Sequence, residues 1–336
     1  MFRDTKFFMG IDVSKPFFDA SLMAVVDYQK QPIETARFEN STEGMKSFEK
    51  WLKRHKAPMD ENALLVIENT GIYHRIIWSF CSKKKLPIHI GNAAHIKWSF
   101  GIARGKNDKI DSIRLCQYAQ KHYDEIKATP VLDPVLMQLK DLATSRTHLL
   151  SQLNSNKTYL KELKNVSNQT VQKHLENAYK TAIEGITQSI KSLEVLITEI
   201  INKNTAFKTN YDLLITVPGI GHVTAVYLIC CTCNFAGKIS GKQLACYAGV
   251  VPFENKSGIS IKGKNRVHKM ANKDLKKLFH LCALAAIQHC LELKTYYNRK
   301  KDEGKHPMSI LNAVRNKIAL RAASVVNNQK PYVENA

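Results

Sequence analysis

The order of secondary-structure elements expected over the first 130 residues constrains the fold of this chain most strongly. Three apolar segments follow one another between turn residues, which predicts antiparallel strands at 6–13, 17–27 and 34–40. Helices and strands then alternate, with helices expected at 42–56, 72–84, 93–100 and 108–122 and strands at 63–69 and 86–91. This order predicts an α/β domain over residues 1–130, with a mixed sheet and helices on both faces.

Long helices are expected from residue 134 onward. Leucines repeat with heptad spacing between Leu139 and Leu163, and isoleucines repeat between Ile183 and Ile200, after the polar break at 165–170. Two such helices predict an antiparallel hairpin or a coiled-coil oligomerisation arm over residues 131–206. The polar interruptions Arg146 and Asn156 are of the kind that often sets register or oligomeric state.

The last third, residues 207–330, is expected to be mainly helical. The segment 211–229 contains a Pro-Gly-Ile-Gly turn between two apolar stretches, the pattern of a helix-hairpin-helix, in which Gly219 and Gly221 would let backbone N–H groups meet a phosphate. An ordinary turn between helices uses the same glycines. Further helices are expected at 242–252, 271–291 and 307–327, with an exposed basic loop at 253–269.

Positive charge is concentrated at the C-terminal end. The whole chain has a formal net charge of +21, and residues 256–330 contain 17 basic and 4 acidic side chains. That density indicates a polyanion-binding surface, and nucleic acid is the expected partner. An anionic membrane is disfavoured because no basic amphipathic helix with an aromatic face is present, and no apolar run reaches the ~18 residues of a membrane span. With no secretory signal and eight cysteines, we expect reduced thiols in the cytoplasm of a bacterial cell.

Four acids stand at positions where an α/β fold gathers functional groups. Asp12 ends the first expected strand, Glu68 ends the fourth, and Asp108 and Asp111 begin a late helix. Each acid alone has a structural explanation, such as Asp108 capping its helix or Glu68 pairing with a lysine. Four carboxylates at one point, however, require cations, and two Mg²⁺ ions roughly 3.5–4 Å apart would hold them and activate a nucleophile on phosphate. The joint pattern predicts a ribonuclease-H-like acidic site.

Several motifs resemble one family of DEDD transposases, the one-ten insertion-sequence family, which includes pilin-gene-inverting recombinases. GIDVSK at 10–15, VIENTGIYH at 66–74 and GKNDKIDSIRLCQYA at 105–119 are similar to its RuvC-like domain. VPGIGHVTA at 217–225, KQLACYAGVVPFENKSG at 242–258 and KGKNRVHKMANKDLKKLF at 262–279 resemble its C-terminal transposase domain. The resemblance covers nearly the whole chain in the family's order and spacing.

The resemblance implies more than the residues alone suggest. It implies a RuvC-like DEDD domain with a Mg²⁺ site (or Mn²⁺) at the four acids, a coiled-coil arm, and a nucleophilic serine that motif position assigns to Ser257. In the family, acids and serine meet between subunits and form a phosphoserine link to DNA, and a structured noncoding RNA pairs with donor and target DNA. A homodimer or tetramer is therefore expected. Nucleic-acid contacts are expected from four residues of the basic segment: Lys262, Lys264, Arg266 and Lys269.

Other readings of these residues stay open. A Holliday-junction-type metal nuclease would use the same acids with water as the attacking group, and Ser257 would then be a loop residue without activating neighbours. A DNA invertase would use the same chemistry without transposition. A nucleic-acid-binding protein without catalysis would have purely structural acids, and loss of metal-dependent cleavage on replacing Asp12 would exclude it.

Overall fold

The computed structural model describes residues 5–69, 71–100, 107–164, 168–257, 261–267 and 271–334. It divides into two compact units, residues 1–132 and 133–336, which are described one at a time. Among the described residues, no helix is both long enough and apolar enough to span a bilayer.

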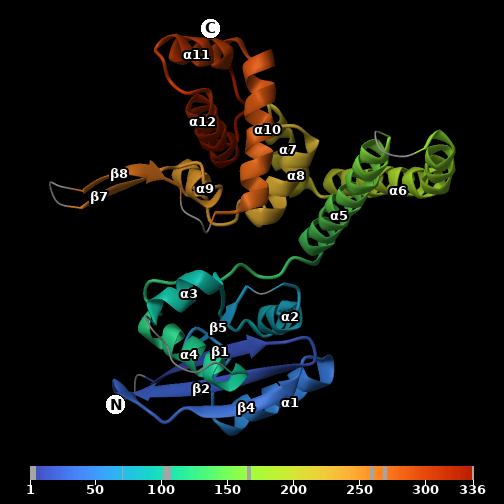
Figure 1. Cartoon of the computed structure of the whole chain (residues 1–336). Helices are drawn as coiled ribbons and strands as arrows, with labels where there is room; N and C mark the ends of the chain where they lie inside the picture. The colour runs from blue at the N-terminus through green and yellow to red at the C-terminus, as the bar shows by residue number, and fades with distance from the viewer. Residues whose placement is uncertain are drawn as a thin grey trace. The chain divides into compact units, whose positions relative to one another are not determined.

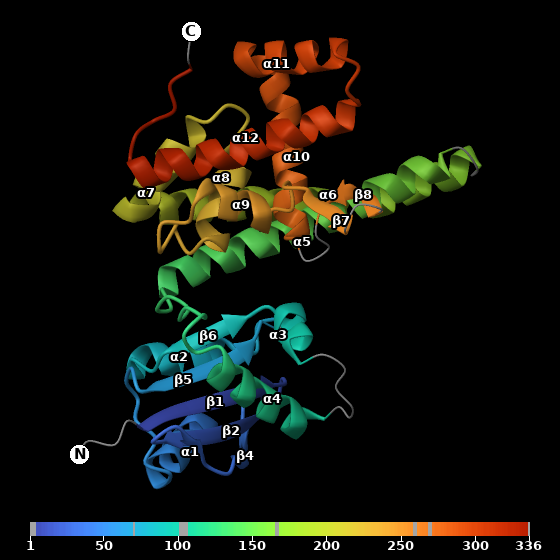
Figure 2. The same ribbon diagram turned by 90° about the vertical axis from the view of Figure 1, so that its left-hand side faces the viewer.

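A six-stranded mixed sheet forms the centre of the first unit. Strand β1 (Thr5–Val13) pairs antiparallel with β2 (Phe17–Val26) and parallel with β5 (Ala63–Glu68). The sheet continues from β5 to the parallel strand β6 (Ile88–Gly91), and on its other side both β4 (Glu34–Glu39) and the short β3 (Gln29–Lys30) pair with β2. Figure 2 shows β2, β1, β5 and β6 side by side.

Helices cover both faces of this sheet, as the element order predicts. Around the strands lie α1 (Thr42–Arg54), α2 (Arg75–Lys84), α3 (Ala93–Ser99) and α4 (Asp108–Lys121). Phe18 and Phe38 point to one face and pack against Phe48 of α1, with ring centroids 5.4–5.6 Å apart. Side chains on the opposite face of the sheet, such as Phe8 and Val66, pack against Leu115 of α4. The expected ribonuclease-H-like, RuvC-like fold of the N-terminal part is confirmed.

Close packing of α4 on β1 depends on Gly10. A Cβ atom built on Gly10 would stand 2.1 Å from the backbone nitrogen of Cys116 and 2.2 Å from the carbonyl oxygen of Ser112, both in α4. The buried hydroxyls of Ser112 and Ser21 share a hydrogen bond of 2.7 Å across the same contact. Only glycine at position 10 therefore allows the helix to lie directly on the central strand.

We expect Gly10→Ala to destabilise the first unit by about 1–3 kcal/mol or more, because α4 must move away from β1. All three tryptophans, Trp51, Trp78 and Trp98, belong to this unit, so the urea midpoint of tryptophan fluorescence reports on it. Gly185→Ala is the control, since a Cβ on Gly185 of the second unit meets no atom within 4 Å. An unchanged midpoint for Gly10→Ala would contradict the role assigned to Gly10.

The second unit begins with the expected pair of long helices, α5 (Pro134–Leu163) and α6 (Gln169–Lys203). They are antiparallel, because Arg146 pairs with Glu194 at 2.7 Å while Lys164, near the end of α5, pairs with Glu176 near the start of α6 at 3.5 Å. The polar interruption at Arg146 is thus satisfied within the hairpin. Of the two arrangements expected for these helices, the chain itself forms the hairpin (Figure 1).

In the part of the second unit that the structure describes, six further helices and one β-hairpin follow. The helices are α7 (Thr205–Ile215), α8 (His222–Cys231), α9 (Gly241–Tyr247), α10 (Lys273–His289), α11 (Leu291–Asp302) and α12 (Pro307–Asn328). They enclose one apolar core that includes Leu214, Ile229, Phe279 and Ile318. The mainly helical C-terminal part, with the helix-hairpin-helix α7–α8, is confirmed.

Besides the short strand β3 in a stretch expected as a turn, two larger details differ from expectation. The segment expected as a loop at 253–269 contains the antiparallel strands β7 (Phe253–Ser257) and β8 (Ile261–Arg266). The segment is largely polar, so it has no alternation of apolar and polar residues that would predict a strand. A hairpin forms there nonetheless, because backbone hydrogen bonds do not require apolar side chains. Helix α11 also occupies a stretch in which no helix is predicted. Its sequence is rich in charged residues and only Leu293 is buried, so it has no apolar stripe with helical spacing.

Candidate active site

The sheet register brings one polar row to the α4 face. Asp12 of β1 lies opposite Asp19 of β2, and Asp19 lies opposite Arg37 of β4. On the other side of β1, Ile11 pairs with Ile67 of β5, so the next residues, Asp12 and Glu68, end neighbouring parallel strands. Directly opposed residues share a face of a sheet. Four adjacent strands therefore present Glu68, Asp12, Asp19 and Arg37 in one line.

Helix α4 adds the two remaining acids at its first turn. Asn107 is the N-cap, and its side-chain oxygen accepts a hydrogen bond from the backbone N–H of Ile110 at 2.8 Å. Asp108 is therefore not the capping residue, and its carboxylate is free of that structural task. Asp111 forms an ion pair with Arg114 at 2.9 Å.

The other carboxylates of this row and of α4 act on Asp12 through space. Burial of Asp12, together with the negative charges of Asp108, Asp111, Glu68 and Asp19, raises the pKa of the Asp12 carboxyl to about 6. Repulsion among acids disfavours the ionised form of the most enclosed one. The structure thus brings together all four sequence-predicted acids, with Asp12 at their centre.

The polar row also contains Asp19 and Arg37, two residues that the sequence-based prediction does not include. The guanidinium of Arg37 donates hydrogen bonds to Asp19 Oδ2 from Nη2 at 2.7 Å and from Nε at 3.1 Å. Its Nη2 also lies 3.4 Å from Asp108 Oδ2. A signal for Asp19 exists in the sequence: it is an acid inside an apolar strand, where it is 92% buried, with a relative exposure of 8%. Arg37 has no comparable signal, because its place follows from the pairing of β4 with β2.

The donor set suits a hard divalent cation, which prefers carboxylate oxygens. Burial of the Asp12 carboxylate and the negative charges near it disfavour its ionised form, and a bound cation would offset both effects. Within the described ranges, however, no three His, Cys, Asp or Glu side chains converge closely enough to hold an ion as they stand. The residues therefore fit a metal chemically and electrostatically, and their side chains would have to turn toward it.

The residues predicted to act in the C-terminal part lie on the β7–β8 hairpin or next to it. Ser257 is the last residue of β7 and pairs with Ile261, while Lys262 pairs with Lys256. Lys264 and Arg266 follow along β8, and Arg266 pairs with Phe253. The side chains of these residues, and Lys269 as a whole, lie outside what the structure describes.

The two glycines of the helix-hairpin-helix differ in their surroundings. Gly219 has φ +87°, and a Cβ there would be 2.2 Å from the carbonyl oxygen of Cys282, so the packing of α10 requires this glycine. Gly221 has an ordinary φ of −100° and is the N-cap of α8, and a Cβ there would meet no atom within 4 Å. The fold alone therefore does not explain glycine at position 221.

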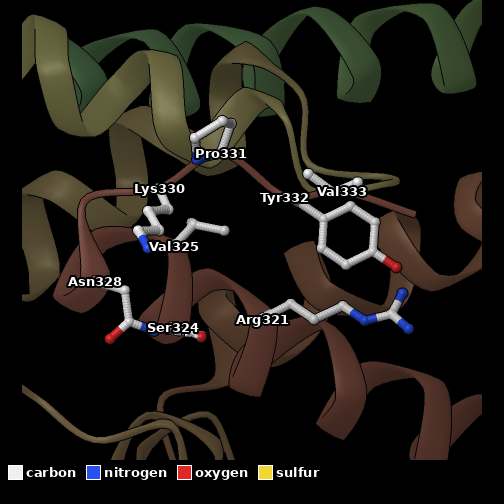
Figure 3. Close-up of a pocket in the computed structure, with 8 residues that line it drawn as sticks. All are labelled: Arg321, Ser324, Val325, Asn328, Lys330, Pro331, Tyr332 and Val333. Atoms are coloured by element: carbon white, nitrogen blue, oxygen red, sulfur yellow. Dashed lines mark hydrogen bonds between the residues drawn. The ribbon is translucent and has the colours of Figure 1, made fainter. Parts of the chain in front are cut away.

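A cavity of about 460 Å³ lies between α12 and the C-terminal segment and contains none of the predicted site residues (Figure 3). Arg321 at its wall forms an ion pair with Glu292 of α11, and the Tyr332 hydroxyl donates a hydrogen bond of 2.8 Å to the same carboxylate. The guanidinium carbon of Arg321 also lies 4.8 Å from the ring centroid of Tyr332. These contacts fasten the C-terminal segment to α11 and α12, so we assign the cavity a structural role.

Comparison with known proteins places both parts of the chain in the same group. The DEDD transposase model of IS110 matches residues 9–165, and the model described as the transposase IS116/IS110/IS902 family matches residues 211–298. Pilin gene-inverting proteins of Moraxella bovis and Moraxella lacunata are each 28% identical over 341 aligned residues, covering 98% of this chain and 98% of each relative. An uncharacterised 43.6 kDa protein of insertion element IS110 from Streptomyces coelicolor is 32% identical over 108 residues, covering 32% of this chain and 26% of that protein.

The first match spans the acidic row together with α4, and the second runs from within α7 through α8 and the β7–β8 hairpin. Members of such a family cleave and rejoin DNA strands. This chain belongs to the IS116/IS110/IS902 family of transposases and is a DNA transposase or recombinase.

Proposed function

We propose that this enzyme breaks and rejoins DNA through a divalent-metal site at Asp12, Glu68, Asp108 and Asp111 and a nucleophilic Ser257. The observation that carries the proposal is the gathering of these carboxylates near Asp12, where burial and their negative charges raise the pKa of Asp12 to about 6. Acids spaced over 99 residues of sequence would otherwise repel each other without benefit to the fold. Their assembly is best understood as a function of the site.

Mg²⁺, or Mn²⁺ in its place, would neutralise the phosphate and stabilise the charge that develops as the phosphodiester is cleaved. Asp12 and Glu68 would hold it from the fixed ends of two paired strands, which orients both carboxylates through the sheet. Asp108 and Asp111 approach from α4, and the close contact at Gly10 sets their distance from the strands. Asp12 and Glu68 are thus fixed by the sheet, whereas the placement of Asp108 and Asp111 depends on the packing of α4 at Gly10.

Ser257 would supply the covalent step. Its Oγ forms a bond to phosphorus, one phosphodiester P–O bond breaks, and the serine proton balances the oxygen that leaves as a strand-end hydroxyl. In rejoining, a strand-end hydroxyl attacks the phosphoserine, which restores the serine and a phosphodiester. Energy of the broken bond is conserved in the phosphoserine, so no external co-reactant is needed.

A denaturing gel for protein attached to labelled DNA tests this proposal. The reaction contains the element's own end DNA, its flanking RNA and Mg²⁺, and a parallel reaction contains chelator. A metal-dependent adduct of slow mobility is the expected result. Cleavage without an adduct would instead identify a metal nuclease that uses water, and no cleavage under any of these conditions would contradict the proposal.

The nucleic-acid surface is proposed to lie on the second unit. Residues 256–330 contain 17 basic and 4 acidic side chains, which supports binding of DNA and of a structured noncoding RNA that guides it. Lys262, Lys264, Arg266 and Lys269 are the proposed contacts. In this scheme residues 1–130 form the acidic domain, 131–206 the arm and 207–330 the serine-bearing domain, and a homodimer or tetramer acting in the bacterial cytoplasm brings acids and serine together.

Gly221 provides a separable test of phosphate contact at the start of α8. We expect Gly221→Ala to weaken DNA binding roughly tenfold, since a methyl group would block backbone N–H groups from a phosphate. Its cost to stability should not exceed about 1 kcal/mol. Gly219→Ala should instead cost about 2–5 kcal/mol, because of its positive φ and the contact with Cys282.

The two variants are compared by filter binding and by far-UV circular dichroism during urea unfolding. If Gly221→Ala binds DNA as the wild type does, the turn is an ordinary connection between helices.

Inversion of a DNA segment is the second candidate. Two relatives that align over 98% of this chain are named pilin gene-inverting proteins. Inversion and transposition share the cleavage and rejoining steps and differ in the arrangement of the recombining sites. A plasmid carrying two inverted end sequences distinguishes them, because an invertase flips the enclosed segment and keeps the plasmid size.

A further inference from the structure

Arg37 is held beside the acidic row in a fixed orientation. Its Nε and Nη2 atoms face the Asp19 carboxylate at 2.7–3.2 Å, and the two residues are register partners on β2 and β4. The Asp19 side chain is only 11% exposed, so the sheet and α4 leave it little freedom. A buried carboxylate that accepts hydrogen bonds from two nitrogens of a guanidinium fixes the plane of the whole group.

The other edge of Arg37 remains available. A guanidinium has five N–H donors, and the hydrogen bonds of Arg37 to described residues use Nε and Nη2, leaving Nη1 without a protein acceptor among them. The Arg37 side chain is 54% exposed. Nη2 lies 3.4 Å from Asp108, which places the group at the margin of the acidic cluster.

The buried Asp19 carboxylate needs a cationic partner, and Nε and Nη2 of Arg37 meet that need. Stability therefore does not explain why the remaining edge of the guanidinium is exposed beside the acids. A DNA phosphate that approaches five carboxylates meets strong repulsion, and a fixed cation at their edge reduces it. Arginine suits this task because its planar fork matches two phosphate oxygens and it stays charged at all physiological pH values.

We propose that Arg37 binds a non-bridging oxygen of the phosphate that is transferred, and that Asp19 positions it for this contact. The negative charge on those oxygens grows as phosphoryl transfer proceeds, so a preoriented guanidinium stabilises the transition state more than the bound substrate. This inference rests on the proposed function for the location of the reacting phosphate. It adds a substrate-binding residue and its anchor to the four acids.

The test compares Arg37→Gln, Arg37→Lys and Asp19→Asn with the wild type. At saturating end DNA we expect Arg37→Gln to lower the single-turnover cleavage rate about 10²-fold. Arg37→Lys should recover part of that loss because it keeps the charge without the fork. The Asp19→Asn, Arg37→Gln double variant should be no slower than Arg37→Gln, since the anchor acts only through the arginine.

Two readouts independent of turnover separate phosphate contact from a structural role. Binding of Mn²⁺, followed by electron paramagnetic resonance, should not weaken in Arg37→Gln, because the arginine is a cation next to the acids. The slope of log Kd for end DNA against log salt, with Ca²⁺ in place of Mg²⁺, should fall by about 0.9, as expected for the loss of one phosphate contact. Arg54→Gln is the matched control: Arg54 is exposed at the end of α1, on the opposite face of the sheet, and its replacement should leave the slope unchanged.

Each outcome is decisive. An unchanged salt slope for Arg37→Gln would overturn the proposal, and so would a large loss of Mn²⁺ binding, which would mean that the arginine merely organises the acids. If the wild type shows no metal-dependent cleavage, the proposed function fails, while the salt slopes still decide whether Arg37 contacts a phosphate.

Discussion

Asp12→Asn is expected to abolish metal-dependent DNA cleavage and, at the same time, to make the first unit more resistant to unfolding at neutral pH. The rate should fall by about 10³-fold or more, because the central carboxylate of the proposed metal site is lost and metal stabilisation of a transition state amounts to several kcal/mol. The gain in stability arises because the ionised Asp12 is partly buried and lies near four other acids, and its neutral replacement removes both the cost of burying the charge and the repulsion.

The sign of the pH dependence follows from the pKa of Asp12, which is about 6 in the folded chain against 3.8 as the ordinary value. Between these values the folded state binds the proton more tightly than the unfolded chain does. The free energy of unfolding of the wild type therefore falls, relative to that of Asp12→Asn, as the pH rises from about 4 to about 6, and the difference is constant above that range. Below pH 4 the two proteins should be equally stable.

Thermal unfolding followed by tryptophan fluorescence measures this, because the three tryptophans report on the first unit alone. Added Mg²⁺ at pH 7.5 should raise the midpoint of the wild type and leave that of Asp12→Asn nearly unchanged. Asp124→Asn, at an exposed position outside the acidic row, is the control and should show neither effect. A variant that loses stability at pH 7.5, or that still responds to Mg²⁺, would argue against an ion-binding role for Asp12.

Ser257→Ala is expected to eliminate the covalent protein–DNA adduct completely, since no other atom of the side chain can form the bond to phosphorus. Mn²⁺ binding and the midpoint of tryptophan fluorescence should stay at wild-type values, because Ser257 lies on β7 of the second unit and the acids lie in the first. This separates the two variants: Asp12→Asn loses metal and chemistry together, whereas Ser257→Ala loses chemistry alone.

The adduct is detected on a denaturing gel and its site is identified by mass spectrometry of the linked peptide. Ser260→Ala is the matched control, because Ser260 is the other serine in the segment between Phe253 and Arg266. An adduct that persists in Ser257→Ala would assign the nucleophile elsewhere. Cleavage at the wild-type rate without any adduct would show that water attacks.

Much of the fold could be predicted because the local patterns and the tertiary structure agree. The strands expected at 6–13 and 63–69 and the helix expected at 108–122 correspond to β1, β5 and α4 to within one residue at each end. Apolar strands bounded by turn residues and an amphipathic helix with a polar first turn carry their own signals. The four acids could be found for the same reason, since each stands where such an element begins or ends.

Other features could not be predicted because they depend on long-range pairing. The β7–β8 hairpin has largely polar residues, and backbone pairing rather than burial forms it. Helix α11 buries only Leu293 and therefore shows no amphipathic stripe. The contribution of Arg37 depends on β4 pairing with β2 in the register that sets it opposite Asp19.

The sequence by itself determined the element order, the family motifs and the identity of the four acids, because these depend on local spacing and on residue chemistry. Only the tertiary structure decided how the acids meet. The register of β1 with β2 and β5 aligns Asp12 with Asp19 and Glu68, and the missing side chain of Gly10 lets α4 lie directly on β1. The physical reason is that side chains far apart in sequence are joined only by strand pairing and close packing, and both depend on the whole sheet rather than on any one segment.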